Sequence, residues 1–114
     1  MFRKLSLAVA ATMLLAGTAY ADPIEGNWKT SSGETAAIAN CGGAFCITLK
    51  SGKFAGKRIG KMQASGSNKY SGEITDPADD KTYSGKATLS GASLNMKGCV
   101  LGGLICKGQT WSKL

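Results

Sequence analysis

The residue types that could carry catalysis are sparse in this chain of 114 residues, which has no histidine, four cysteines and seven acidic side chains. Without an imidazole base, a serine or cysteine nucleophile would need a lysine or a carboxylate as its base. No spacing in the sequence brings a lysine beside a particular serine. Glu25, Glu34 and Glu73 fall on separate predicted strands or turns, so no pair of acids for glycoside hydrolysis is indicated. We therefore expect no catalytic residues and no enzymatic activity.

The acidic cluster of Asp76, Asp79 and Asp80 lacks the spacing of a calcium-binding loop. Such a loop places ligands at alternate positions with glycine at the sixth, whereas here Pro77 and Ala78 follow the first aspartate. A proline-initiated turn with Asp76 as its cap accounts for the cluster better. We expect neither a metal site nor a cofactor.

The cysteines form two close pairs in sequence, Cys41 with Cys46 and Cys99 with Cys106. The intervals of four and six residues fit poorly as a set with the two to four residues that usually separate paired zinc ligands, and export also disfavours zinc. The two-residue interval of a redox pair is absent. Each local pair could clamp a hairpin loop across facing strands, where a Cα separation of about 4.4–6.8 Å is attainable. We favour these two local disulfides. The alternative is a crossed pairing that ties the third strand region to the last hairpin.

Residues 1–21 have the pattern of a secretory signal peptide. Two basic residues near the start are followed by an apolar and small-residue stretch over 5–16, and Ala19-Tyr20-Ala21 is a cleavage motif. The stretch is short of the roughly 20 residues that span a bilayer, so we expect no membrane anchor after cleavage. The mature chain is predicted to begin at Asp22 and to be periplasmic or secreted.

Without that segment the chain has 93 residues with 12 basic and 7 acidic side chains, a net charge of +5. Its few large hydrophobic residues make a thin core, which exported domains of this size often reinforce with disulfides. The positive charge favours anionic partners such as a fatty acid, a glycan phosphate or an acidic protein. The basic residues do not form the stripe with stacking aromatics that binds nucleic acid, so we expect no nucleic-acid partner.

From residue 22 onward, apolar residues alternate with polar ones in short runs separated by turn residues. Eight strands are predicted, at 26–30, 35–40, 45–50, 57–64, 69–75, 82–89, 93–98 and 108–113. Short connections make strands that are adjacent in sequence adjacent in the sheet. Since no helix covers the sheet, it must form either a sandwich or a closed barrel. We favour the barrel, because closure also removes the exposed edges that invite aggregation. We predict an all-β fold, a small antiparallel up-and-down β-barrel, as a single domain over 22–114.

The aromatic residues offer the best candidates for a ligand site. Trp28 begins the first predicted strand and Trp111 ends the last, and these two strands pair when a barrel closes. Both rings are therefore expected at the same end, with Lys113 or another base over an indole face. They are either core plugs or part of a pocket, and small inner-face residues at Gly85 and Ala87 would leave room for one. Our candidate ligand-binding residues are Trp28, Phe45, Tyr83 and Trp111.

A competing hypothesis is a protein-interaction module of the cell envelope, such as a stress factor or an inhibitor of a secreted enzyme. It would use the cysteine-flanked loops at 42–45 and 100–105. The second loop has an apolar tip, and an exposed tip of this kind is typical of a partner site. The candidate interaction residues are Val100, Leu101, Leu104 and Ile105.

The chain also resembles known families. Gly26-x-Trp28 is similar to the short motif that opens the first strand of lipocalins and other calycins. More of the chain resembles a bacterial exported family named domain of unknown function 2147. The motifs that carry this resemblance run in order from residue 22 to 111, and they are Asp22-Pro23-Ile24-Glu25-Gly26-Asn27-Trp28, Cys41-Gly42-Gly43-Ala44-Phe45-Cys46, Gly72-Glu73-Ile74-Thr75-Asp76-Pro77, Lys81-Thr82-Tyr83, Gly98-Cys99-Val100-Leu101-Gly102 and Gln109-Thr110-Trp111.

The chain departs from the family pattern at two hairpins. It has Thr75 and Asp79-Asp80 where the family often has tyrosine and Asp-Gly, and Ile47 where the family commonly has glycine. The resemblance implies a calycin-like barrel that is periplasmic or secreted, and it implies no established activity. Together with the residues, it predicts a non-catalytic protein that binds a small apolar or anionic ligand in the mouth of the barrel.

Overall fold

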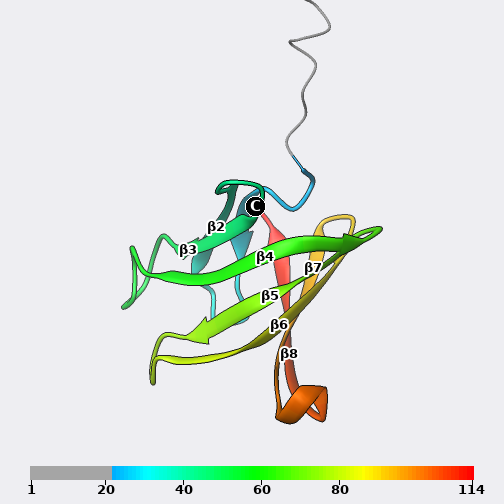
Figure 1. Ribbon diagram of the computed structural model, residues 1–114. Coiled ribbons are helices and arrows are strands. Elements are labelled where there is room, and N and C mark those ends of the chain that lie inside the picture. Colours follow the sequence, from blue (N-terminus) through cyan, green and yellow to red (C-terminus); the bar gives the residue numbers. More distant parts are fainter. Residues whose placement is uncertain (1–21) are drawn as a thin grey trace, which may run out of the picture.

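The computed structural model describes residues 22–114, which form eight strands and one short 3-10 turn (Figure 1). The predicted signal peptide lies outside the described residues. The elements are β1 (Gly26–Lys29), β2 (Thr35–Asn40), β3 (Phe45–Leu49), β4 (Arg58–Gly66), β5 (Lys69–Asp76), β6 (Lys81–Ser90), β7 (Ser93–Val100), η1 (Leu101–Gly103) and β8 (Ile105–Lys113).

All eight predicted strands are present, and the largest difference lies in the last hairpin. β8 begins at Ile105 rather than at residue 108, because Val100 pairs with Ile105 and the strands continue to the η1 turn. The loop predicted at 100–105 is therefore a tight hairpin end on a long two-stranded arm. This arm projects at the bottom of Figure 1.

The strands form a closed antiparallel barrel in which each strand pairs with the next one along the chain. β1 and β8 close it through the pairs Trp28–Lys113 and Lys29–Ser112. The predicted up-and-down barrel is thus confirmed, and it is the architecture that the family resemblance implied. Closure pairs only the end of β8 with β1, at Ser112 and Lys113, so the rest of β8 pairs with β7 alone.

Because successive strands run in opposite directions, the connections fall at two ends of the barrel. We call the closed end the one that carries residues 22–25 and the turns β2–β3, β4–β5 and β6–β7. We call the open end the one that carries the connections β1–β2, β3–β4 and β5–β6 and the projecting β7–β8 arm. The chain terminus at Leu114 lies at the closed end, where its backbone N–H donates to the Asn27 carbonyl.

Inward-facing side chains fill the barrel as strand alternation requires. In β6, Ala87 and Leu89 are buried between exposed neighbours, and Leu94 and Met96 repeat the pattern in β7. No buried side-chain nitrogen or oxygen of the described residues lacks a hydrogen-bond partner. The core consists of Ile24, Trp28, Ala36, Ile38, Phe45, Ile47, Leu49, Ile59, Met62, Tyr70, Ala87, Leu89, Leu94, Met96 and Trp111.

Both disulfides are local, as the spacing favoured. Cys41–Cys46 spans the β2–β3 turn at the closed end with a Cα separation of 5.8 Å. Cys99–Cys106 joins directly paired residues of β7 and β8 with a Cα separation of 4.1 Å. Two structural disulfides in a domain of this size are typical of a non-cytoplasmic protein.

Over residues 22–114, the structure has no helix with the length and apolar character needed to cross a membrane.

Candidate functional site

The closed end is built around Trp28, whose side chain is fully buried. Its indole Nε1–H donates to the Ile24 carbonyl oxygen at 2.9 Å. The Lys113 amine lies 4.8 Å from the centre of the Trp28 ring and donates to the carbonyl oxygens of Pro23 (3.1 Å) and Glu25 (2.6 Å). The predicted stacking of a base over an indole is therefore confirmed, and it ties residues 22–25 to the end of β8.

The contact between Lys113 and Trp28 explains why glycine occupies the first position of the Gly-x-Trp motif. Gly26 has a φ of 131°, a conformation that side-chain-bearing residues rarely adopt. A Cβ at Gly26 would lie 3.0 Å from the Lys113 Nζ atom. The glycine therefore provides the space in which the lysine amine reaches across the Trp28 ring.

A second buried aromatic pair completes the closed end. Tyr70 and Phe45 pack edge to face, with ring centres 5.7 Å apart and an interplanar angle of 88°. The Tyr70 hydroxyl donates a hydrogen bond to the Asp22 carboxylate. Burial raises the pKa of the Tyr70 hydroxyl above its usual value, and the hydrogen bond to Asp22 and the charge of that carboxylate raise it further. The closed end is thus packed and has its polar groups paired, so we do not consider it a ligand site.

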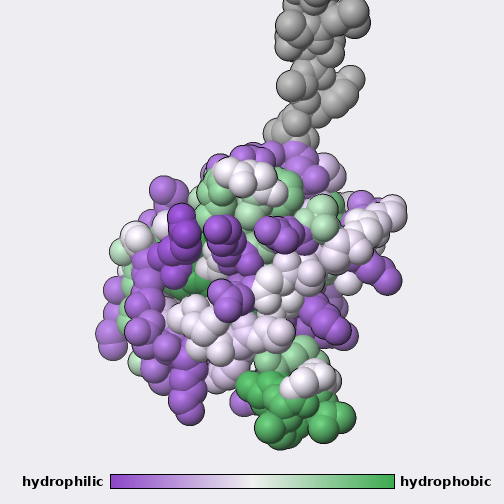
Figure 2. Space-filling view, in the orientation of Figure 1, coloured by the Kyte–Doolittle hydropathy of each residue, from purple (hydrophilic) through white to green (hydrophobic). Residues whose placement is uncertain are grey.

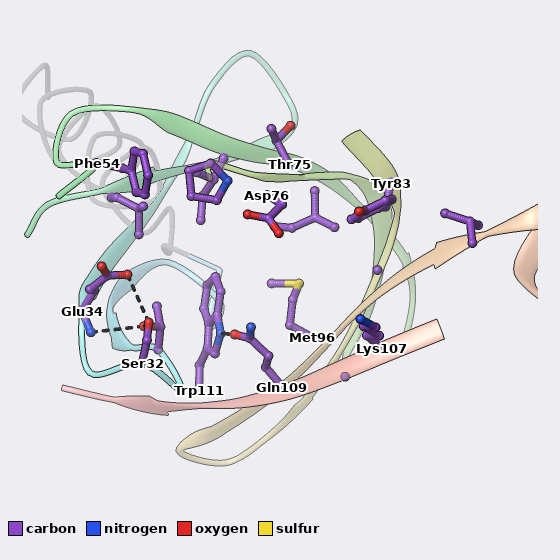
Figure 3. Close-up of a pocket in the computed structure, with 18 of the residues that line it drawn as sticks. Ser32, Glu34, Phe54, Thr75, Asp76, Tyr83, Met96, Lys107, Gln109 and Trp111 are labelled. Carbon is purple, nitrogen blue, oxygen red and sulfur yellow. Dashed lines mark hydrogen bonds between the residues drawn. The ribbon is translucent and has the colours of Figure 1, made fainter. Parts of the chain in front are cut away.

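The open end contains a cavity of about 640 Å³ (Figure 3). This volume lies in the range of about 300–1,000 Å³ that is typical of small-molecule sites. Leu49, Ile59, Ile74, Met96 and Trp111 contribute apolar side chains to its lining.

Partly exposed apolar side chains continue the lining outward from this wall. Phe54 comes from the β3–β4 loop and Tyr83 from the start of β6, and both are half-buried. Val100 and Ile105 of the β7–β8 arm also line the cavity. The apolar surface is therefore continuous from the interior of the barrel to the base of the arm.

Polar side chains at the cavity mostly bond to one another or to nearby backbone. Gln109 Oε1 accepts a hydrogen bond of 2.9 Å from the Trp111 indole, and Ser32 donates to Glu34 Oε1 at 3.1 Å. The Asp76 carboxylate accepts a 2.9 Å bond from the backbone N–H of Ala78, as expected for the cap of a proline turn.

The charged side chains of the lining are two carboxylates, Glu34 and Asp76, and one amine, Lys107. The local charge balance of the cavity is therefore the reverse of the positive charge of the whole domain. Within residues 22–114, no group of three or more Cys, Asp or Glu side chains is placed to hold a metal ion.

The structure separates the four predicted ligand-binding residues. Tyr83 and Trp111 line the cavity, whereas Trp28 and Phe45 belong to the packed closed end. The expectation that both tryptophans plug one end is wrong. Trp111 pairs with Leu94, two residues before the Lys113–Trp28 pair, so its ring lies one inward-facing layer nearer to the open end.

The small inner-face residues do not make the cavity either. A Cβ at Gly85 would lie 2.9 Å from the Met62 Cε atom, so the methionine side chain occupies the room that this glycine leaves. Neither Gly85 nor Ala87 lines the cavity. Among the residues that the sequence analysis missed, Ile74 follows an alternating pattern with Tyr70 and could have been found, but no local pattern marks Phe54.

The predicted interaction loops also differ from each other. In the β2–β3 loop, Ala44 and Phe45 are buried, so this loop presents no large apolar surface. In the β7–β8 arm, Val100, Leu101, Leu104 and Ile105 are all exposed.

Comparison with known proteins yields one family. A family model described as an uncharacterized protein conserved in bacteria, DUF2147, matches residues 26–113. No curated protein and no solved structure gives a significant match.

Proposed function

The chain belongs to the uncharacterized bacterial family DUF2147, and we propose that its barrel is a non-catalytic binding protein for a small apolar molecule held at the open end. The observation that carries this proposal is the cavity of about 640 Å³ whose wall is built from the apolar side chains of five strands and the β3–β4 loop. Eight-stranded barrels of other proteins hold one small ligand in a comparable position.

The chemistry of the lining supports binding rather than catalysis. The polar groups at the cavity include no imidazole, because the chain has no histidine. Gln109 and Asp76 are engaged in hydrogen bonds that orient them. The Ser32 hydroxyl donates to Glu34, but this contact is exposed to solvent and joins residues two apart in the β1–β2 connection. A pocket with apolar walls and a few oriented polar groups is the arrangement that small-molecule binding sites share.

The charges of the lining favour an uncharged or apolar ligand over an anionic one. Two carboxylates and one amine surround the cavity, so an anion that entered it would meet a net negative charge. A molecule with an apolar body and a neutral hydrogen-bonding group would match both the wall and the Gln109 amide. We further propose that the protein works in the periplasm or is secreted, which agrees with its two disulfides.

The proposal is tested by titrating the protein with N-phenyl-1-naphthylamine, an uncharged dye that fluoresces in apolar sites. We expect saturable binding that Ile74→Asn weakens about tenfold, because an amide replaces aliphatic surface in the wall. Ser84→Asn is the matched control, since Ser84 lies exposed on the outward face of β6 beside Tyr83, the residue that pairs with Ile74. Saturable binding that is equal in both variants, or no binding at all, would overturn the proposal.

The competing function, a protein-interaction module of the envelope, is favoured by the exposed apolar residues of the β7–β8 arm. Native mass spectrometry of the protein isolated from its own envelope distinguishes the two functions. A retained small molecule of a few hundred daltons supports the binding protein. A stoichiometric protein partner and an empty cavity support the interaction module.

A further inference from the structure

The β7–β8 arm ends in four exposed aliphatic side chains, which we call the apolar tip: Val100, Leu101, Leu104 and Ile105. Leu101 is 68% exposed and Leu104 is 85% exposed. Figure 2 shows the tip as a hydrophobic knob that projects from a mainly hydrophilic face. Two leucines this exposed bury little apolar surface in their own domain, so they contribute little to its stability.

The backbone of the tip presents these side chains at a conformational cost. Leu101 has a φ of 54°, in the left-handed region where glycine and asparagine are favoured. Gly102 and Gly103 continue the turn with φ values of 66° and 96°, and the Cys99–Cys106 disulfide joins the two strands beneath it. The turn would be more stable with asparagine at position 101, so the leucine is not explained by the turn itself.

The charges of the chain are divided unevenly around this arm. Residues 22–80 carry seven basic and seven acidic side chains, so their net charge is zero. Residues 81–114, which form β6, β7, the tip and β8, carry five lysines and no acidic residue. The whole net charge of +5 therefore lies on the three strands that include the arm.

On the outer face of these strands, Lys86 lies directly opposite Lys97. Like charges in cross-strand pairs oppose folding, and neither lysine has an acidic partner within hydrogen-bonding distance among the described residues. An anionic surface that covers this face would relieve the repulsion. Lys107 places a further amine on the arm, two residues after Ile105.

We propose that the apolar tip docks the barrel onto an anionic phospholipid bilayer. The four aliphatic side chains would enter the boundary between headgroups and acyl chains, while the lysines of β6–β8 other than Lys113 contact the anionic headgroups. Lys113 takes no part, because its amine is held at the closed end by Pro23 and Glu25. A protein partner fits these observations less well, because the tip has none of the Trp, Tyr or Arg anchors that dominate protein interfaces. This docking does not require the cavity to hold a ligand, so it stands or fails independently of the proposed function.

The position of the tip also connects the bilayer with the cavity. Val100 and Ile105 belong both to the tip and to the cavity lining. A barrel that docks through the tip, with the outer face of β6 and β7 against the headgroups, would therefore hold the rim of its open end beside the membrane surface, with apolar side chains along the path between them.

The test is co-sedimentation of the oxidised protein with vesicles of phosphatidylglycerol and phosphatidylcholine, compared with pure phosphatidylcholine. We expect binding to the anionic vesicles that weakens with added salt, since screening acts on the lysine contacts. The double variant Leu101→Asn with Leu104→Asn should lower the partition coefficient at least tenfold, because two buried leucines are lost. The double variant keeps the fold because both side chains are exposed and asparagine suits the backbone at position 101.

The matched control is Leu114→Asn, which removes an equally exposed leucine (65%) at the closed end and should change binding less than twofold. A tryptophan placed at position 104 by Leu104→Trp should shift its emission to the blue on anionic vesicles, whereas Leu114→Trp should not. No binding of the wild type, or equal binding of the two asparagine variants, would overturn the proposal. Tip-dependent capture of a single protein without vesicle binding would also overturn it.

Discussion

At the closed end Trp28 is fully buried beneath Lys113 and residues 22–25, whereas at the open end Trp111 forms one wall of a cavity of about 640 Å³. The strands that meet the two ends are the same, so the difference comes from what lies beyond them. At the closed end, a short segment before β1 crosses the barrel and brings Ile24 onto the Trp28 indole. At the open end, the connections surround the cavity and leave it accessible.

Polar contacts distinguish the two ends in the same way. The Lys113 amine and the Tyr70 hydroxyl bond to residues 22–25, so these side chains tie the segment to the barrel. At the open end, Gln109 and Glu34 bond to near neighbours in sequence, and two long-range polar contacts, Lys57 with Asp80 and Ser31 with the Thr110 carbonyl, involve exposed side chains. A barrel can thus concentrate its stability at one end and keep the other for binding.

The largest expected effect on stability comes from removing an aromatic side chain at each end and comparing the two losses. Trp28→Ala should lower the free energy of unfolding by about 3–5 kcal/mol, because it empties a fully enclosed site. Phe54→Ala, at the half-buried rim of the cavity, should cost no more than about 1.5 kcal/mol because water already reaches that side chain. Urea unfolding followed by circular dichroism measures both values. Equal losses would contradict the division of stability between the ends.

A smaller effect is expected from the hydroxyl that holds Asp22. Tyr70→Phe should cost about 1 kcal/mol at neutral pH through the loss of one buried hydrogen bond. The pKa of Tyr70 is raised in the folded state, so its contribution is fully present below the unfolded pKa of about 10 and is lost as the pH rises above it.

The pH effect is measured as the difference between wild type and Tyr70→Phe in urea unfolding between pH 8 and 11. Using the difference removes the titration of the lysines, which both proteins share. The wild type should lose stability relative to the variant above pH 10. A difference that stays constant with pH would mean that Tyr70 ionises equally in the folded and unfolded states.

The smallest effect concerns the two lysines at opposite ends of β8. Lys113→Met keeps most of the aliphatic stem and removes the amine above Trp28, with an expected loss of about 0.5–1 kcal/mol. Lys107→Met makes the same change at the open end and should leave the stability within about 0.5 kcal/mol. Thermal unfolding at matched ionic strength compares the two. A larger effect at Lys107 would show that the rim is more constrained than its contacts indicate.

Local patterns in the sequence predicted several contacts between adjacent strands, although Trp28 and Phe45 of the closed end were assigned to a ligand site. The Gly26-x-Trp28 motif and the basic residue two positions after Trp111 suggested a lysine over an indole, and Lys113 occupies that position over Trp28. The local disulfides followed from intervals that suit facing strands. These features depend on contacts between adjacent strands or short turns, whose register can be estimated from alternation.

The candidate site could be predicted only in part. Tyr83 and Trp111 were expected to line a pocket and do so, whereas Phe45 was chosen as an aromatic candidate in the same way and lies at the other end. Alternation shows which residues face inward but does not show how far along the barrel axis each one lies. Phe54 reaches the cavity from a loop, where no periodicity exists to reveal it.

From the sequence alone, the strand order, the closed antiparallel architecture and the local cysteine pairs could be predicted over their alternatives, because each depends on residues close together in the chain. The depth of each side chain within the barrel was decided by the tertiary structure, since it depends on register summed over eight pairings. The same is true of the crossing of residues 22–25, which closes one end. The cavity at the other end remains because no segment crosses the barrel there. Its lining residues come from many separate parts of the chain, so no single stretch of the sequence predicts it.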